Sequence, residues 1–337
     1  MGLYYNLLKH ALFRLNPEKA HYLTLNALKA AHEVGISKLF PALPKKPVEV
    51  MGFTFPNPVG LAAGMDKNGE YIEALAALGF GFIEVGTLTP KPQTGNPKPR
   101  LFRLTKEEAI INRMGFNNKG VDFFVEQIKQ VKYKGILGVN IGKNAKTPNE
   151  KAVEDYLYCF RRVYPYAGYV VINISSPNTE GLRDLQAAEA LKALLHSLKK
   201  EQKILTDHEK RYVPLVVKIS PDLSDDALAD VATVLLAEGI DGVIATNTTL
   251  RRTGVEGSPF ANEVGGLSGK PLTQTSATMT KKLYQILGSN IPIISVGGIM
   301  TAADAKERFQ SGAALVQLYT GLIYEGPALL NEILTQL

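Results

Sequence analysis

Small and polar residues stand at the ends of eight short apolar runs in this sequence. Small residues let a large planar ligand approach closely, while amide and hydroxyl side chains can orient the polar edge of such a ligand. One asparagine on a loop is usually turn chemistry, but several of them at converging strand ends favour ligand binding. The residues at these ends are, in chain order, Ala63-Gly64, Thr87, Asn140, Asn173, Lys218, Thr246-Asn247-Thr248, Gly297-Gly298 and Tyr319-Thr320-Gly321.

Lys218 closes the apolar stretch Leu215-Val216-Val217. An unpaired ammonium buried at such a place costs on the order of several kcal/mol. Lys218 therefore needs an anionic partner, which is either a bound ligand or a carboxylate of the core.

The segment Asn173-Ile174-Ser175-Ser176-Pro177-Asn178 carries two adjacent hydroxyls. Alternation along a strand would send them to opposite sides, so the pattern alone does not choose between Ser175 and Ser176. A structural serine–proline turn explains the pattern equally well.

These residues are positioned by an alternation of apolar and amphipathic segments from residue 58 onward. The apolar segments are short and rich in Val and Ile, as expected of parallel strands buried on both faces. They cover residues 59–63, 81–85, 136–141, 169–174, 215–219, 242–245, 293–296 and 314–318. Helical patterns cover residues 71–78, 121–131, 152–164, 188–199, 226–237, 277–287, 302–310 and 328–337.

Eight strand–helix units predict an α/β fold, a (β/α)8 TIM barrel, rather than an open doubly wound sheet. Loops at the C-terminal strand ends form the active site of such barrels, and the glycines after the seventh and eighth strands match its common phosphate site. Residues 49–55 alternate like a tight hairpin that would plug the barrel floor. The connections 88–118 and 248–273 are too long for simple loops and are therefore candidates for loops with a functional role.

Residues 1–46 carry seven lysines and arginines against two glutamates, a net +5 of the chain's +6. This segment contains two amphipathic helical runs, separated by Asn16-Pro17. Neither run reaches the ~20 uncharged apolar residues of a membrane-spanning helix. A basic helical hairpin of this kind either lies in a membrane interface or packs on its own domain. We expect a hairpin of residues 1–46 and a barrel of residues 47–337. The apolar face of the first run comprises Leu3, Tyr4, Leu7, Leu8, Ala11 and Leu12.

The composition excludes several classes of protein. A nucleic-acid binder would spread a basic face over its main domain, whereas the basic excess here belongs to one terminal segment. The single cysteine, Cys159, cannot form an internal disulfide, and its position in an amphipathic run predicts a buried apolar side chain. The histidines are scattered, so we expect no metal site.

Six segments in order along the chain resemble dihydroorotate dehydrogenase of pyrimidine biosynthesis. They are AAGMDKNGE (62–70), INRMGFNN (111–118), NISSPNT (173–179), GVIATNTT (242–249), GGLSGKPL (265–272) and VGGI (296–299). The likeness runs from about residue 3 to the C-terminus. The N-terminal hairpin and the second serine of NISSPNT resemble the membrane-associated, quinone-reducing class 2 branch. The soluble class 1 enzymes lack the extension and carry a cysteine as the base.

The resemblance implies oxidation of (S)-dihydroorotate to orotate in UMP biosynthesis, with one FMN per chain and a membrane quinone as electron acceptor. It implies a peripheral enzyme held through residues 1–46 on the cytoplasmic face of the inner membrane. Ser176 would be the base and flavin N5 the hydride acceptor, with the loop through Asn178 and Gly181 as a lid. His21 and Arg103 would flank the quinone path.

The resemblance also assigns the remaining contacts. The implied substrate contacts are Lys67, Asn112, Arg113, Met114, Gly115, Phe116, Asn173, Asn178, Asn247 and Thr248. The implied cofactor contacts are Ala63, Gly64, Lys67, Thr87, Asn140, Asn173, Lys218, Thr246, Gly269, Gly298, Tyr319 and Thr320.

Two other hypotheses stay open. The first is a soluble flavin barrel that oxidises dihydroorotate or a dihydropyrimidine with fumarate or a nicotinamide. The hairpin, and Ser176 in place of a cysteine, argue against it. The second is a ligand-binding or membrane-scaffolding barrel that has lost its chemistry, and the intact Ser176, Lys67 and Lys218 argue against that.

Overall fold

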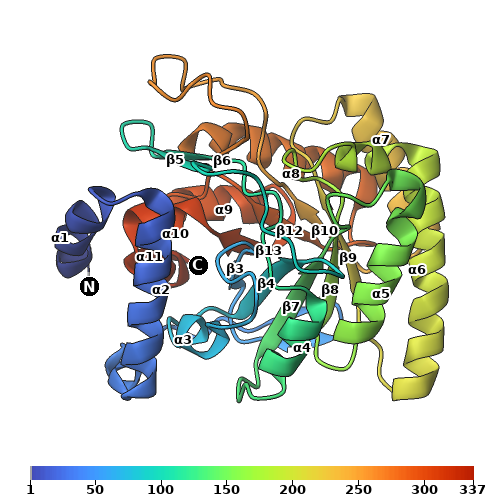
Figure 1. Ribbon diagram of the computed structural model, residues 1–337, viewed down its shortest axis with the longest axis horizontal. Helices are drawn as coiled ribbons and strands as arrows, with labels where there is room; N and C mark the ends of the chain where they lie inside the picture. Colours follow the sequence, from blue (N-terminus) through green and yellow to red (C-terminus); the bar gives the residue numbers. More distant parts are fainter. Residues whose placement is uncertain (1) are drawn as a thin grey trace.

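The computed structural model describes residues 2–337, without the side chains of residues 2–4, 6 and 7. Within this range eight parallel strands close into a barrel, and the pairing of Val316 with Val59 completes the ring. The closed ring confirms the predicted fold and excludes the open sheet. Figure 1 shows the strands at the centre with helices around them. The barrel strands are β3 (Val59–Leu61), β4 (Phe82–Leu88), β7 (Ile136–Ile141), β8 (Tyr169–Asn173), β9 (Leu215–Ile219), β10 (Gly242–Ala245), β12 (Ile293–Val296) and β13 (Ala313–Leu318).

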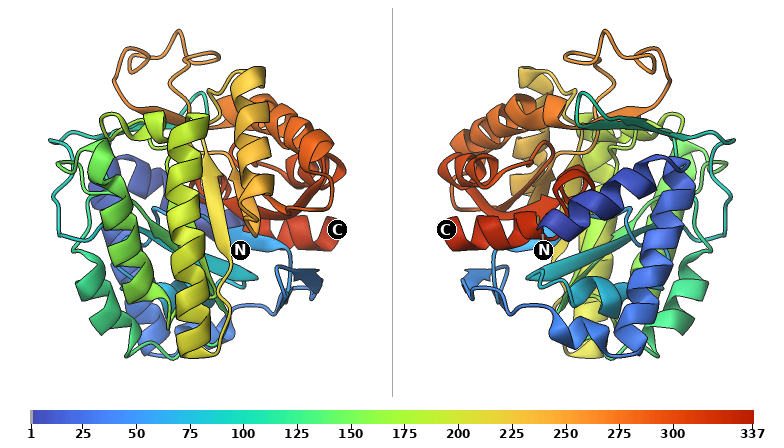
Figure 2. Two further views of the ribbon diagram at one scale, coloured as in Figure 1. Left: turned by 90° about the vertical axis from the view of Figure 1, so that its right-hand side faces the viewer. Right: turned by 90° about the vertical axis from the view of Figure 1, so that its left-hand side faces the viewer.

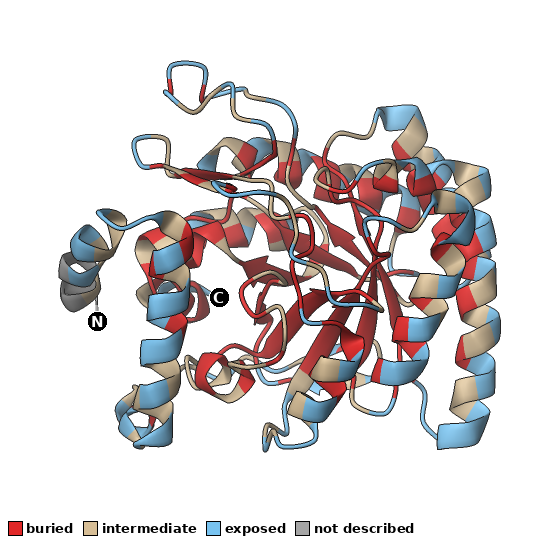
Figure 3. Cartoon of the chain, viewed as in Figure 1, coloured by how far each residue is buried: buried red, intermediate tan, exposed pale blue. Residues whose placement is uncertain are grey.

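The outer helices bury one face against the strands and expose the other to solvent (Figure 3). The helix α6 (Ala188–Glu209) extends ten residues beyond its predicted end at residue 199, because its buried stripe continues through Gln202, whose amide donates to the Val213 carbonyl at 2.8 Å. The short helix α10 (Thr320–Glu325) was not predicted. The other outer helices are α3 (Ile72–Ala76), α4 (Val121–Ile128), α5 (Ala152–Val163), α7 (Asp225–Ala237), α8 (Thr273–Leu287), α9 (Ala302–Gln310) and α11 (Ala328–Gln336).

A hairpin of β1 (Val48–Val50) and β2 (Phe53–Phe55) closes the floor of the barrel, as predicted. Its turn residues Met51 and Gly52 both have positive φ, 52° and 78°, which matches the twist of a two-residue hairpin. Phe55 is fully buried and packs edge-to-face on Phe82, with the ring centroids 5.2 Å apart. The floor is therefore sealed by aromatic side chains, and ligands must enter from the other end.

The two long connections form a small antiparallel sheet over the opposite end of the barrel. This sheet, here called the mouth sheet, has the order β11 (Gly266–Gly269), β6 (Ala109–Asn112) and β5 (Leu101–Leu104). In Figure 1 it projects above the barrel. The sequence indicated only that these connections were long.

The chain begins with α1 (Gly2–Phe13) and α2 (Pro17–Glu33), followed by a 3-10 turn at Ile36–Leu39. Asn16 caps α2 by accepting the N–H of Glu18 at 3.1 Å. The right-hand view in Figure 2 shows α1 beside the C-terminal helices. Tyr5 on α1 donates its hydroxyl to the Ile323 carbonyl at 2.7 Å, so the two ends of the chain meet.

The N-terminal segment packs partly on the barrel domain and partly faces solvent. Ala20 and Leu25 on α2 are buried against the domain, whereas Val34 and Leu39 just beyond it are 73% and 82% exposed. The Leu8 side chain is exposed too, but those of Leu3, Tyr4 and Leu7 are outside the described part of the structure. In residues 2–337 no helix is both long and apolar enough to cross a bilayer.

Candidate active site

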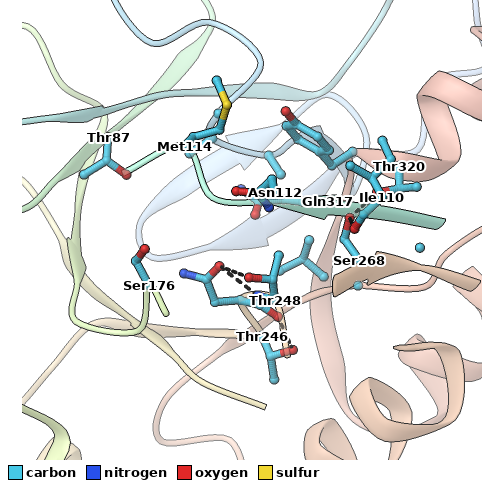
Figure 4. A pocket seen from close by; sticks show the side chains of 18 of the residues that line it. Thr87, Ile110, Asn112, Met114, Ser176, Thr246, Thr248, Ser268, Gln317 and Thr320 are labelled. Atoms are coloured by element: carbon cyan, nitrogen blue, oxygen red, sulfur yellow. Dashed lines mark hydrogen bonds between the residues drawn. The ribbon is translucent and has the colours of Figure 1, made fainter. Parts of the chain in front are cut away.

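A cavity opens at the C-terminal ends of the barrel strands and holds about 1240 Å³ of empty space, its open mouth included. Its walls come from the strand ends, from the mouth sheet and from α2. In Figure 4, Thr87 and Ser176 lie on one side of it, and Ser268 and Thr320 lie on the other. The predicted residues that line it are His21, Ala63, Gly64, Lys67, Thr87, Asn112, Met114, Gly115, Phe116, Asn173, Ser176, Asn178, Lys218, Thr246, Asn247, Thr248, Gly269, Gly298, Tyr319 and Thr320.

A buried carboxylate, Glu84 on β4, organises the polar groups beneath the cavity. Glu84 accepts hydrogen bonds from the amides of Asn140 at 2.8 Å and Gln317 at 2.5 Å. The Lys218 ammonium lies 3.8 Å from it, so the partner of Lys218 within the chain is a core carboxylate. Burial and the negative charge of Glu84 raise the pKa of Tyr169, whose hydroxyl lies 3.5 Å from the Glu84 carboxylate.

Hydrogen-bonded amide side chains link Glu84 to the cavity wall. Asn140 is fully buried, and its amide oxygen accepts from Thr87 at 2.6 Å and from Asn173 at 3.0 Å. Asn173 also donates to the Thr87 hydroxyl at 3.1 Å. Asn140 therefore fixes two cavity residues from behind without lining the cavity itself.

The structure separates the two adjacent serines. The Ser175 hydroxyl donates to the Asn173 amide oxygen at 3.2 Å and accepts from Asn247 at 3.0 Å, and Ser175 does not line the cavity. Ser176 lines the cavity, and its Oγ accepts the backbone N–H of Asn178 at 3.2 Å. Of the two, Ser176 is therefore the hydroxyl available to a ligand.

Lys67 is held in place by a compact loop after β3. The Asp66 carboxylate accepts the N–H groups of the four residues from 68 to 71, the shortest of these bonds being that to Tyr71 at 2.7 Å. Lys67 keeps part of its surface open to the cavity. Loss of hydration around its ammonium, together with the charge of Arg100, lowers the pKa of Lys67 to about 8.

One wall of the cavity is supplied by α2. Glu18 on this helix and Arg100 before β5 form a buried ion pair with an N–O distance of 2.7 Å. Burial alone would raise the pKa of Glu18, but Arg100 and Lys98 hold it below its usual value. Burial and the nearby Lys67 lower the pKa of His21 to about 3, so this imidazole is neutral.

Two predicted site residues besides Asn140 do not line the cavity. Arg113 pairs with Glu263 at 2.5 Å and lies over the Phe102 ring. Arg103 donates to the Phe13 carbonyl at 3.0 Å and stacks on the ring of that residue, 4.1 Å from its centroid. Both arginines join the mouth sheet to neighbouring segments.

Several residues of the site escaped the sequence analysis. Glu84 and Gln317 lie inside apolar strands, and a polar residue in such a run is the signal that could have revealed them. Arg100 and Glu18 gave no local signal, because they are 82 positions apart. Among the described residues no group of three His, Cys, Asp or Glu side chains could hold a metal ion, and Cys159 is buried.

Comparison with known proteins gives a consistent result. The family model for dihydroorotate dehydrogenase matches residues 46–337. The dihydroorotate dehydrogenase (quinone) of Methylobacillus flagellatus is 56% identical over 330 residues, which are 98% of either chain. The protein of the same name from Cellvibrio japonicus is 58% identical over 97% of this chain and 96% of its own.

Solved structures agree with the sequence relatives. The crystal structure of DHODH from Eimeria tenella in complex with ferulenol has a TM-score of 0.86 and 38% identity. The similarity covers 97% of this chain and 93% of that one. The fold and these relatives define a (β/α)8-barrel oxidoreductase with a helical N-terminal extension. The chain belongs to the dihydroorotate dehydrogenase family, in its quinone branch.

Replacing Glu84 with Gln should strongly destabilise the protein, because it leaves the Lys218 ammonium without its carboxylate partner. The expected loss is about 3–5 kcal/mol in the free energy of unfolding, measured with urea. The double variant Glu84→Gln/Lys218→Met removes both charges and should recover most of that loss. A single variant within about 0.5 kcal/mol of the parent would show that the pair does not hold the site together.

Proposed function

We propose that the protein oxidises (S)-dihydroorotate to orotate, with FMN as cofactor and a membrane quinone as electron acceptor, as a step of UMP synthesis. The proposal is carried by one observation: Ser176, Lys67 and a group of asparagines face one cavity above Lys218. The names of the relatives supply the substrate and the acceptor.

The polar side chains and main-chain groups that line the cavity suit the binding of FMN. The buried Gln317 Oε1 has no hydrogen-bond partner among the described residues, and a ring N–H of a ligand would satisfy it. Gly298 lines the cavity with φ +72°, and a Cβ there would collide with the Thr273 backbone, so glycine is required and its main chain would be available to a phosphate. When bound, FMN supplies a hydride acceptor at N5, which no side chain provides.

The residues that would hold FMN come from most of the strand ends. Lys218 would place a positive charge beside the ring, while Asn140 would act from behind through Thr87 and Asn173. The other contacts would be Ala63, Gly64, Lys67, Thr246, Gly269, Gly298, Tyr319 and Thr320.

Dihydroorotate carries a carboxylate and two amide-like edges. Lys67 would pair with the carboxylate, and asparagines suit the amide edges because each offers a donor and an acceptor without charge. Asn178 already donates to the Asn112 oxygen at 3.2 Å, so the two amides share an orientation. Asn173, Asn247, Thr248 and the loop of residues 113–116 would complete the contacts, with the Arg113 side chain directed elsewhere.

Ser176 would remove the proton from the substrate carbon beside the carbonyl. A serine is a weak base, so it needs a relay to water and protection from bulk solvent. The N–H of Asn178 at 3.2 Å from Oγ favours negative charge on this oxygen. The loop through Asn178 and Gly181 would cover the reacting atoms as a lid.

Electron transfer to quinone would use residues 1–46 as a membrane-facing part, with residues 47–337 as the catalytic barrel. His21 lines the cavity and is neutral, which suits a path for an apolar quinone. Arg103 lies between α1 and the mouth sheet, near the same wall. The exposed Val34 and Leu39 with the basic charge of this segment suit the cytoplasmic face of an inner membrane.

The decisive experiment mixes the anaerobic holoprotein with dihydroorotate and follows the flavin absorbance. We expect bleaching by the substrate and rapid recovery after a short-chain quinone is added, but none with fumarate or NAD. Recovery with a soluble acceptor alone would contradict the quinone assignment. A bound flavin that dihydroorotate does not bleach would contradict the substrate.

The variant Ser176→Ala should keep the yellow flavin but lose on the order of 10²–10⁴-fold in the rate of bleaching, because the proton acceptor is missing. The measurement is anaerobic stopped-flow absorbance. Ser197→Ala, which removes an exposed hydroxyl on α6, is the matched control. Unchanged bleaching kinetics in Ser176→Ala would remove this residue from the mechanism.

Orotate binding should weaken as the pH rises through about 8, because free Lys67 then loses the charge that pairs with the carboxylate. Its pKa is lowered in the folded protein, so the cationic form prevails only below that value. Titration of the flavin spectrum with orotate between pH 6.5 and 9 measures the effect. Lys67→Gln should bind weakly with no such step, and a step retained in this variant would assign it elsewhere.

A further inference from the structure

The Arg183 guanidinium lies where three loops at the barrel mouth meet. It belongs to the 3-10 segment Leu182–Gln186 in the loop after β8, here called the serine loop (residues 174–187). Its Nε donates to the Ser175 carbonyl at 3.1 Å within this loop. Its Nη2 donates to the Thr248 carbonyl in the loop after β10 at 2.9 Å, and its Nη1 to Asp222 in the loop after β9 at 2.8 Å.

Asp222 ties the same loops from the other side. Its Oδ2 accepts the Leu250 N–H at 2.9 Å, and its Oδ1 accepts the Thr249 hydroxyl. Its own N–H donates to the Ser220 hydroxyl at 3.1 Å, which holds its loop in shape. The side chains of Arg183 and Asp222 are only 21% and 17% exposed, so water screens their attraction less than at an open surface.

The other side-chain ties of the serine loop are uncharged. Asn149 donates to the Gly181 carbonyl at 2.7 Å, and Asn96 donates to the Asn178 carbonyl at 3.3 Å. Gln186 accepts the Ser220 N–H at 2.9 Å. Within the described chain, the Arg183–Asp222 pair is the salt bridge that fastens this loop.

The two carbonyls that Arg183 holds belong to residues next to the reaction. Ser175 precedes Ser176 in the chain, and Thr248 follows Asn247. A planar guanidinium has donors in fixed directions, so it sets the distance between the two loops. A lysine at this position would offer one point charge and could not hold three acceptors in the same geometry.

We propose that Arg183, held by Asp222, is a positioning residue that keeps Ser176 at a fixed distance from Asn247 and Thr248. The inference rests on the proposed function, in which these residues face one substrate. Arg183 itself does not line the cavity, so its effect passes through the two carbonyls. A displacement of about 1 Å in a reacting group can cost about 10²-fold in rate.

The first test compares the holoenzyme variants Arg183→Gln, Arg183→Lys and Asp222→Asn by anaerobic stopped flow. At saturating dihydroorotate we expect bleaching to slow by about 10–100-fold in Arg183→Gln, with a smaller change in substrate Kd. Arg183→Lys should recover little. The double variant Arg183→Gln/Asp222→Asn should be no slower than the slower single variant, because both residues act as one unit.

The matched control is Arg161→Gln, which breaks the two-bonded Arg161–Glu201 pair between α5 and α6, away from the cavity. It should bleach at the parental rate. Parental rates in both Arg183 variants would overturn the proposal, and so would full recovery by Arg183→Lys, because a point charge would then suffice.

Amide hydrogen exchange of the substrate-free holoenzyme gives a readout that does not depend on turnover. Arg183→Gln should speed exchange in residues 176–187 and also in residues 247–250, while the barrel strands keep parental rates. Faster exchange throughout the barrel would mean general destabilisation and would contradict a positioning role. If dihydroorotate fails to bleach the parent protein, the proposed function fails, but the coupled exchange of the two loops still decides whether Arg183 joins them.

Discussion

The site depends on one buried negative charge, that of Glu84 inside the barrel. A carboxylate inside an apolar barrel is stable only when its oxygens have hydrogen-bond or ionic partners. Here these partners are Asn140, Gln317 and Lys218. Each of these partners comes from a different strand, so satisfying one carboxylate fixes the relative positions of the strand ends. The cavity inherits its geometry from this requirement, since Asn140 then orients Thr87 and Asn173.

Two further ion pairs hold the outer parts of the site in place. The Glu18–Arg100 pair fastens α2 over the cavity, and the Arg183–Asp222 pair fastens the loops on another part of its rim. A wall built from a terminal helix and from loops would otherwise be mobile, because such segments bury little apolar surface. The cavity therefore has a lower layer set by strand packing and a rim in which charge pairs join α2 and the loops to the rest of the domain.

The barrel itself could be predicted from the sequence, because strand and helix patterns are local and the eight runs of Val and Ile needed no distant information. The mouth sheet could not, since its pairing is not local: Ile111 pairs with Leu267 far along the chain. Residues at strand ends were found for the same local reason. Arg183 was missed because what makes it informative is its contact with Thr248, 65 positions away, and no spacing rule encodes that.

The meeting of the chain ends has a consequence for biosynthesis. The helix α1 reaches α10 through Tyr5 and Lys9, whose partners Ile323 and Tyr324 lie near the C-terminus. During translation α1 leaves the ribosome long before α10 has been made, so it can dock on α10 only after most of the barrel has been synthesised. Every newly made chain therefore passes through a stage in which the barrel strands have been synthesised and α1 has not yet docked.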